Sequence, residues 1–417
     1  MSLIGQQTKE TTTRQFAEHV SSGKVDFFTQ AGIDFIIGKR EGIYIWDVDG
    51  MQLINCHCNG GVFNLGHRNP RIVSALKNAL EELDIGNHHF VSEARALLAN
   101  RLSAMSRGDL NRVVFGVSGG EAIDMAIKIA RAHSGKSGVI SALGGYHGHT
   151  GLALAAGDES FRKPFGPLAP GFNQVPFGDI RSLEDAINED TAAVIFETIP
   201  ATFGIVIPPD DFYQDVRQLC DQYSVVMIID EVQSGLGRCG TIWGIDAYDV
   251  VPDILVTGKG LSGGIYPVTA TIYREHLNPF LHENPFIHVS TFGGAEVGCY
   301  AALEVLNILE EPGFLEHVQE MAGLFEAGFD SLKAKHPQVM VGARQKGLMM
   351  GLKMNSEMLG PLMTRIGFEA GLLTIYSNND PSVVQILPPL IIQDDEVRMV
   401  LGILDGMLAK VEQMTGQ

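Results

Sequence analysis

Short runs of apolar, largely β-branched residues recur through the middle of the chain, and each ends in a polar residue or a glycine-containing turn. Several of these runs are followed by an amphipathic helical pattern. Strands that alternate with helices are typical of an α/β fold with a mainly parallel sheet. We predict strands near residues 112–117, 138–142, 192–196, 225–229, 254–256 and 268–273. We predict helices near residues 121–132, 182–188 and 210–223.

The two ends of the chain differ from this central part. Residues 44–50 read Tyr-Ile-Trp-Asp-Val-Asp-Gly, in which Asp-Gly favours the tight turn of a β-hairpin. From about residue 297 onward helical periodicity dominates, notably over residues 301–309 and 315–333. At roughly 150 residues per domain, the 417 residues suggest two to three domains, or equally a single large α/β unit with an appended piece. From the pattern along the chain we expect a central domain flanked by terminal segments.

Composition excludes several classes of partner. The 49 acidic and 30 basic residues give a net charge of −19, which disfavours nucleic acid or an anionic membrane as a partner. No run reaches the roughly 18 apolar residues of a membrane span, and the N-terminus lacks the features of a secretion signal. The 5 cysteines are scattered and odd in number, which indicates a reducing compartment. We therefore expect a soluble, cytoplasmic protein.

The sequence predicts no catalytic metal. Cys56-His57-Cys58 lacks a second Cys or His pair at zinc-finger spacing, so we interpret these cysteines as buried structural residues. Four further histidines form no closed ligand set with carboxylates or cysteines: His88, His89, His147 and His149.

In a parallel sheet, ligands bind beyond the carboxyl ends of the strands, so the residues after each predicted strand are candidates for the site. In Ser118-Gly119-Gly120-Glu121 the serine and the glutamate have the spacing of a capping box. Unobstructed backbone N–H groups at the start of this helix favour a phosphate. A tight turn with an ordinary cap is the alternative explanation.

Two charged residues follow other strands at the same edge. Asp230 ends a run apolar enough for a central strand, where a buried carboxylate needs a cationic partner. Metal ligation, general-base catalysis and pairing with a protonated heterocycle are the functional options, and a plain helix N-cap or a surface aspartate is the alternative. Lys259, flanked by Gly258 and Gly260, is a candidate Schiff-base nucleophile, with a solvated loop lysine as the alternative.

A glycine pattern after Asp230 could indicate a site for a nicotinamide dinucleotide. Gly235-Leu236-Gly237-Arg238-Cys239-Gly240 matches GxGxxG, a motif that should directly follow a strand and open a helix. Here the glycines begin several residues after the strand, and the residues that follow lack a helical pattern. We therefore do not expect a nicotinamide site.

Taken in order, these segments resemble the class III aminotransferases, the ω-aminotransferase branch of the pyridoxal-phosphate enzymes of fold type I. The matching motifs cover most of the chain: Asp47-Val48-Asp49-Gly50, Leu65-Gly66-His67, Ser118-Gly119-Gly120-Glu121-Ala122, Tyr146-His147-Gly148, Glu197, Asp230-Glu231-Val232-Gln233-Ser234-Gly235-Leu236-Gly237-Arg238, Thr257-Gly258-Lys259-Gly260, Thr291-Phe292-Gly293-Gly294 and Leu387-Pro388-Pro389-Leu390.

The resemblance implies an α/β fold type I PLP-transferase with its mainly parallel sheet in a large domain of residues 59–296. Residues 1–58 and 297–417 would combine in a smaller α+β domain. It implies pyridoxal 5'-phosphate (PLP) as the cofactor, with Lys259 as the Schiff-base and proton-transfer residue, Asp230 paired with the pyridine nitrogen and Tyr146 stacked on the ring. The other implied cofactor contacts are Ser118, Gly119, Gly120, Glu197, Gln233 and Thr291. Because Thr291 would reach the neighbouring subunit's phosphate, a homodimer or higher homo-oligomer is expected.

Departures from the family pattern bear on the substrate. Gly120 stands where the family usually has a threonine, so one phosphate-binding hydroxyl is missing. The arginine that clamps a substrate α-carboxylate in many members is Gln385 here, and the glutamate that pairs with it in ornithine- and 4-aminobutyrate-type members is Thr202. A glutamine cannot reproduce a bidentate arginine–carboxylate pair, so we do not expect 2-oxoglutarate to bind in the usual pose. Arg162 is a candidate substitute, or else a solvated loop arginine.

The leading hypothesis is an aminotransferase acting between an amine or ω-amino acid and a keto acid or aldehyde. The alternative is an aminomutase, epimerase, decarboxylase or phospho-lyase on the same fold, since Lys259 and Asp230 serve all of these reactions. A catalytically silent cofactor-binding protein is a third hypothesis, which the intact set of Lys259, Asp230 and Tyr146 disfavours.

Overall fold

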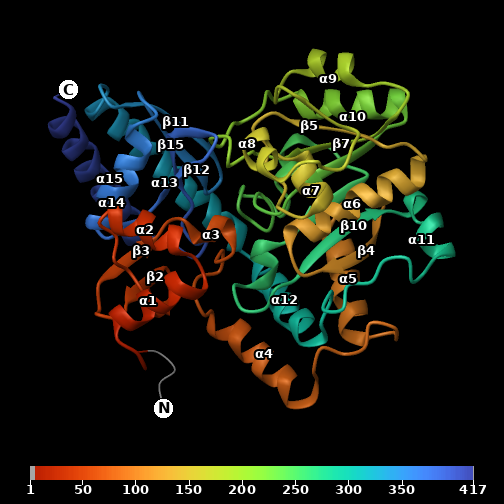
Figure 1. Ribbon diagram of the computed structural model, residues 1–417, viewed down its shortest axis with the longest axis horizontal. Helices are drawn as coiled ribbons and strands as arrows, with labels where there is room; N and C mark the ends of the chain where they lie inside the picture. The colour runs from red at the N-terminus through yellow and green to blue at the C-terminus, as the bar shows by residue number, and fades with distance from the viewer. Residues whose placement is uncertain (1–4, 417) are drawn as a thin grey trace.

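The computed structural model describes residues 5–416, so residues 1–4 of the expected N-terminal segment lie outside it. Its largest sheet has seven strands in the order β4-β10-β9-β8-β7-β5-β6 (Figure 1). In that order the strands are β4 (Leu110–Gly116), β10 (Thr269–Arg274), β9 (Ile254–Thr257), β8 (Val226–Asp230), β7 (Thr191–Glu197), β5 (Gly138–Ala142) and β6 (Phe172–Val175).

The direction of the strands confirms the predicted fold class. From β9 to β6 all neighbouring pairs are parallel, whereas β10 runs antiparallel to both β4 and β9. The predicted strands all form, and β6 is an addition. Its four residues, Phe-Asn-Gln-Val, are too polar to predict a strand, but they pair with β5 at the sheet's edge.

Helices cover both faces of this sheet, which explains why its central strands are apolar without alternation. Every residue of β7 and β8 is buried. On one face α6 packs against the sheet, and α5, α10 and α12 contribute to the core on the other. The helices of this part are α4 (Pro70–Glu82), α5 (Glu93–Met105), α6 (Gly119–Ser134), α7 (Gly151–Ala156), α8 (Glu159–Arg162), α9 (Ile180–Ala186), α10 (Phe212–Tyr223), α11 (Pro279–Glu283) and α12 (Glu296–Leu309).

Segments from both ends of the chain form a second body, in which the red and blue ribbons of Figure 1 lie side by side. One sheet has the order β1-β2-β3-β13, and its last pair is parallel and joins β3 to β13. The other sheet has the order β11-β12-β15-β14. The strands are β1 (Ile37–Glu41), β2 (Tyr44–Asp47), β3 (Gln52–Asn55), β11 (Met340–Lys346), β12 (Met349–Met354), β13 (Leu372–Leu373), β14 (Ile375–Ser377) and β15 (Asp380–Ile386). The exact division of the chain at residues 58 and 296 stays a prediction.

The C-terminal part contains more strand than its helical periodicity predicts. The two expected helices form as α12 and α13 (Phe314–Lys335), but β11, β12 and β15 follow them. Glycines and methionines in these strands obscure a period of two. The remaining helices are α1 (Lys9–His19), α2 (Ser22–Gln30), α3 (Cys58–Gly61), α14 (Leu359–Glu369) and α15 (Asp394–Thr415).

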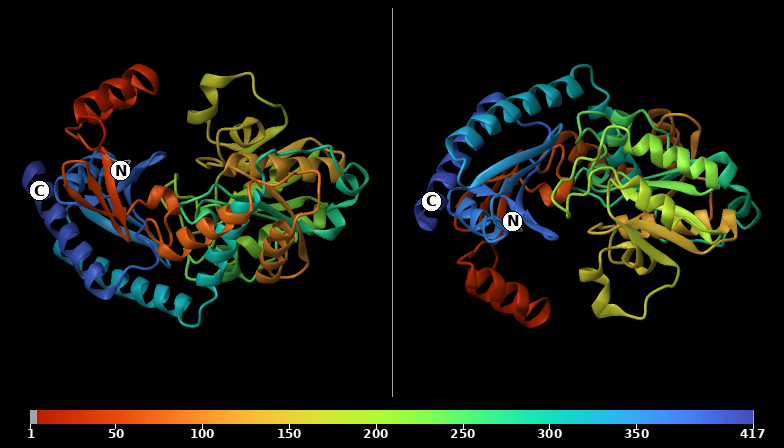
Figure 2. Two further views of the ribbon diagram at one scale, coloured as in Figure 1. Left: turned by 90° about the horizontal axis from the view of Figure 1, so that it is seen from below. Right: turned by 90° about the horizontal axis from the view of Figure 1, so that it is seen from above.

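Helices α1 and α2 project from this second body (Figure 2), and neither has a buried residue. Among residues 5–416, no helix combines the length and the apolar character that a membrane crossing needs.

Candidate active site

A cavity of about 380 Å³ lies at the carboxyl edge of the large sheet, within the usual size range of small-molecule sites. Strand ends and the loops that follow them supply its walls. The residues that line it include Ser118, Gly119, Gly120, Tyr146, His147, His149, Ile199, Glu197, Asp230, Gln233 and Lys259. The structure therefore brings together most of the predicted cofactor residues, and adds His147.

Lys259 follows β9, is half-buried and lines the cavity. Its Nζ donates a hydrogen bond of 2.7 Å to Oε1 of Gln233. Burial lowers the pKa of the lysine, although the negative charges of Asp230 and Glu197 oppose the shift. The residue has a φ of 41°, a left-handed conformation that is strained for a side chain with a Cβ. A lysine amine of reduced basicity, held in one orientation, is suited to nucleophilic chemistry.

Asp230 ends β8 and is paired with His147. The Nδ1 atom of His147 lies 2.8 Å from Oδ2 of Asp230, and the backbone N–H of Val232 donates to Oδ1 at 3.0 Å. Burial by itself would lower the pKa of His147, but the hydrogen bond and the charge of Asp230 outweigh it and the pKa is raised. Sequence reasoning missed this pair. Two features of the sequence could have indicated the pair: a buried carboxylate at Asp230, which requires a compensating group, and a histidine next to Tyr146.

Glu197 places a second carboxylate beside the first. It ends β7 and is the register partner of Asp230 on the parallel strand β8. Its Oε1 accepts a hydrogen bond of 2.9 Å from the backbone N–H of Tyr146. Burial raises the pKa of Glu197 to about 7, and the charge of Asp230 acts in the same direction, while His147 and Lys259 oppose both.

The start of α6 has the features of an anion site. Ser118 is its N-cap, with Oγ accepting from the backbone N–H of Glu121 at 3.3 Å, and Oε2 of Glu121 accepts from Val117 at 2.7 Å. The first amides of a helix have no intrahelical acceptor, and the dipole favours a negative group there. A Cβ on Gly120 would lie 2.8 Å from Oγ1 of Thr150, so the close approach of the neighbouring loop requires glycine.

Another buried carboxylate fixes the segment that follows Asp230. Glu231 accepts hydrogen bonds from the Thr198 and Ser234 hydroxyls and from the backbone N–H groups of Gly244 and Ile245. Burial raises its pKa to about 7 despite these four donors. Glu231 therefore connects the segments that follow β7 and β8 with the loop at Gly244, and its partner Ser234 lines the cavity. Sequence reasoning did not assign this role.

The predicted substrate residues lie outside the cavity lining. The amide Nε2 of Gln385 donates to the carbonyl of Ala201 at 3.2 Å and to Oγ of Ser377 at 3.0 Å. Thr202 stands in the same loop as Ala201. Arg162, on α8, donates to the carbonyl of Ala155 at 3.2 Å. Their substrate roles stay predictions.

Thr291 also lies outside the lining, on an exposed loop that precedes α12. Its contact with a neighbouring subunit stays a prediction. Within residues 5–416, no three His, Cys, Asp or Glu side chains gather in an arrangement that could hold a metal ion.

Each chemical part of PLP has a matching group around this cavity. The start of α6 suits a phosphate, the Asp230 carboxylate suits a protonated ring nitrogen, and the Lys259 amine suits an aldehyde. Nδ1 is the His147 atom that contacts Asp230, whereas Nε2 has no hydrogen-bond partner among residues 5–416. The fold and the site thus define an enzyme that uses PLP.

A family model described as aminotransferase class-III matches residues 29–408. The chain belongs to the class III aminotransferases, as the sequence motifs predict, and PLP is its cofactor. It is 54% identical over 413 residues to an uncharacterized aminotransferase of Archaeoglobus fulgidus, covering 99% of this chain and 97% of that protein.

Solved structures agree with this assignment. The ornithine aminotransferase of Toxoplasma gondii superposes with a TM-score of 0.89 at 26% identity, over 98% of this chain and 97% of the other. The taurine:2-oxoglutarate aminotransferase of Bifidobacterium kashiwanohense, solved with PLP and glutamate, has a TM-score of 0.88 at 27% identity, over 98% and 99% of the two chains.

The raised pKa of His147 predicts how stability depends on pH. A histidine whose folded pKa is raised stabilises the protein fully below about pH 6.5, its unfolded pKa. This stabilisation is lost as the pH rises through the folded pKa. In the cofactor-free protein, the free energy of unfolding of the wild type minus that of His147→Gln should therefore decrease between about pH 6 and pH 9.

Glutamine retains an N–H donor for Asp230 but cannot take a positive charge, so this comparison isolates the charge. Urea unfolding at both pH values measures the difference. The assignment of His147 as a charged partner is wrong if the difference stays constant or grows with pH.

Proposed function

We propose that this aminotransferase transfers an amino group between an amine or ω-amino acid and a keto acid or aldehyde. The observation that carries the proposal is the position of Lys259, Asp230 and Glu197 around one cavity, together with an amide of Gln385 that is already engaged by Ala201 and Ser377.

The residues around the cavity would divide the binding of PLP among them. The first-turn amides of α6, with Ser118, would hold the phosphate, and Tyr146 would cover one face of the ring. Asp230 would bind the ring nitrogen, Gln233 the phenolic oxygen, and Glu197 would brace Asp230 and the Tyr146 backbone. When bound, PLP supplies an electron-accepting ring that stabilises negative charge on the substrate carbon beside the nitrogen.

Lys259 and Asp230 would carry the protein's share of the chemistry. Since burial lowers the pKa of Lys259, a larger fraction of the amine is unprotonated and able to take a proton at Nζ. The hydrogen bond to Gln233 orients that nitrogen. Asp230, stabilised by His147, would keep a proton on the ring nitrogen because a negative charge favours it.

The substrate end of the site distinguishes this chain from members with an arginine clamp. Gln385 and Thr202 stand where the clamp and its glutamate partner are expected, and the loss of both leaves no unpaired charge. We propose that a keto acid such as 2-oxoglutarate does not bind in the usual pose, and that Arg162 is the remaining candidate for a carboxylate contact. The missing clamp also favours a second candidate function, an aminomutase, epimerase, decarboxylase or phospho-lyase.

We further propose a cytoplasmic homodimer or higher homo-oligomer with Thr291 at the subunit interface, and no nucleic-acid or membrane partner. Exposed apolar side chains support this proposal. Phe286, Ile287 and Phe292 flank Thr291 and are 65%, 61% and 54% exposed. In a monomer these three apolar side chains would be left in water, and exposed apolar side chains can mark a protein–protein contact. Sedimentation as a monomer at micromolar concentration would contradict the oligomer.

A half-reaction screen tests the proposed reaction. The PLP-loaded enzyme is mixed with amines, ω-amino acids, α-amino acids and phosphorylated amines while the cofactor's visible absorption and the products are followed. Transamination predicts stoichiometric loss of the visible band with release of an aldehyde or keto product, and Lys259→Ala should show neither. Product without loss of the band would favour the second candidate function. Rapid return of the band with 2-oxoglutarate would contradict the inference from Gln385.

A further inference from the structure

The turn between β14 and β15 reaches across from the second body to the walls of the active-site cavity. Its residue Asn379 makes most of the contacts. The backbone N–H of Asn379 donates to the carbonyl of Thr202 at 2.9 Å, and the side-chain Nδ2 donates to the carbonyl of Gly144 at 2.9 Å. Its Oδ1 accepts from the Ser160 hydroxyl at 3.5 Å. One residue thus ties together three separate segments beside the cavity.

The contact with Gly144 leads directly to Tyr146, which lines the cavity. Gly144 has a φ of 76°, and a Cβ there would lie 2.3 Å from the ring of Phe203. Its N–H donates to Oδ2 of Asp158 at 3.0 Å. Two residues later the N–H of Tyr146 is held by Glu197. Asp158 and Asn379 therefore hydrogen-bond to the backbone of Gly144, and the Phe203 ring packs against it. Of these three residues, only Asn379 belongs to the second body.

The contact with Thr202 holds a second segment beside the cavity, the loop that follows Glu197. This loop continues from Glu197 and from Ile199, which lines the cavity. Three of its carbonyls accept hydrogen bonds from the second body: Ala201 from Ser377 and Gln385, Thr202 from Asn379, and Gly204 from Arg344 at 2.6 Å. Gln385 is one of these donors, so its side-chain amide helps to hold this loop in place.

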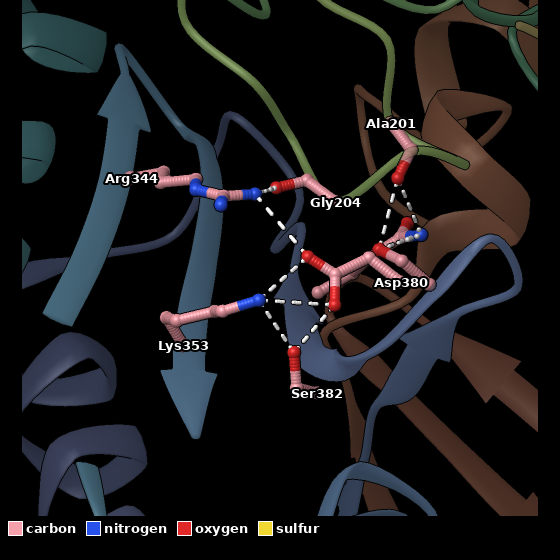
Figure 3. Close-up of polar contacts among 8 residues, drawn as sticks. Ala201, Gly204, Arg344, Lys353, Asp380 and Ser382 are labelled. Atoms are coloured by element: carbon pink, nitrogen blue, oxygen red, sulfur yellow. Dashed lines mark hydrogen bonds and ion pairs between the residues drawn. The ribbon is translucent and has the colours of Figure 1, made fainter. Parts of the chain in front are cut away.

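Ion pairs hold the turn itself in place (Figure 3). Lys353 Nζ lies 2.8 Å and 3.1 Å from the two carboxylate oxygens of Asp380, which follows Asn379, and 2.6 Å from the Ser382 hydroxyl. Arg344 lies 3.6 Å from the same carboxylate. Asp380 is 17% exposed, so water screens these pairs only in part. A turn fixed in this way can hold the parts of the cavity wall that it contacts.

We propose that Asn379 is a positioning residue for the aminotransferase reaction. It acts through Gly144 on the orientation of Tyr146 and through Thr202 on the wall beyond Glu197. The proposal rests on the proposed role of Tyr146 against the face of PLP. It assigns to the second body a direct part in shaping the cofactor site.

Two variants and a matched control test this proposal. Asn379→Asp keeps the size of the side chain but replaces the donor to Gly144 with an oxygen, which repels that carbonyl. Asn379→Ala removes the side chain. Asn378→Ala changes the exposed neighbour, whose amide donates to Oδ1 of Asn379 at 3.0 Å and contacts none of the cavity segments in the described structure.

The first readout needs neither cofactor nor substrate. Hydrogen exchange of the amides of residues 144–146 in the cofactor-free protein should accelerate about fivefold in both Asn379 variants, as expected for the loss of one hydrogen bond. The Asn378 variant should exchange like the wild type. The second readout is the circular dichroism of bound PLP, which should change in shape, with PLP affinity about five- to tenfold weaker.

If both Asn379 variants show the same hydrogen exchange and the same circular dichroism as the wild type, the proposal is wrong. An acceleration spread evenly over both smaller sheets would also overturn it, because that pattern indicates general destabilisation. Failure of the proposed function is recognised separately, since it would appear in the half-reaction screen of the wild type while the exchange and dichroism changes remain.

Discussion

Two carboxylates side by side at the ends of buried strands are the constraint on which the rest of this site depends. Glu197 and Asp230 are register partners on β7 and β8, inside a sheet that helices cover on both faces. Like charges so placed are unfavourable unless positive groups or protons compensate them. His147 pairs with Asp230, Lys259 lies just beyond the end of β9 and interacts with both carboxylates, and the raised pKa of Glu197 favours its protonated form.

The same compensation prepares the site for its cofactor. The contact with His147 holds the Asp230 carboxylate at a fixed position at the end of β8, where it would be available to a protonated ring nitrogen. Burial has two effects here: it makes the charged forms of the carboxylates unfavourable, and it lowers the pKa of Lys259. An anionic cofactor in a chain of net charge −19 needs a local attraction, and we propose that the backbone amides at the start of α6 supply it.

Local sequence patterns predict the central strands, the glycine-opened helix, Asp230 and Lys259, because apolar runs and the residues that end them are adjacent in the chain. They do not predict contacts between distant segments. The pairing of His147 with Asp230 spans 83 residues, and that of Gln385 with Ala201 spans 184. The residues of the edge strand β6 and of the β11–β15 strands favour the strand conformation only weakly, so these segments depend on their pairing partners to form strands. Gln385 illustrates the consequence: the sequence shows which residue is absent, and the fold shows what its replacement holds.

The most direct test of the central claim is the turnover of Asp230→Asn. The variant keeps the size of the side chain and a hydrogen-bond acceptor for the Val232 amide, but it removes the charge that His147 stabilises and that the ring nitrogen would require. Its kcat, measured with PLP-saturated and correctly folded protein, should fall by on the order of 100-fold or more. Asp185→Asn, at an exposed position on α9, should leave kcat unchanged. Turnover of Asp230→Asn within a few-fold of the wild type would contradict the account.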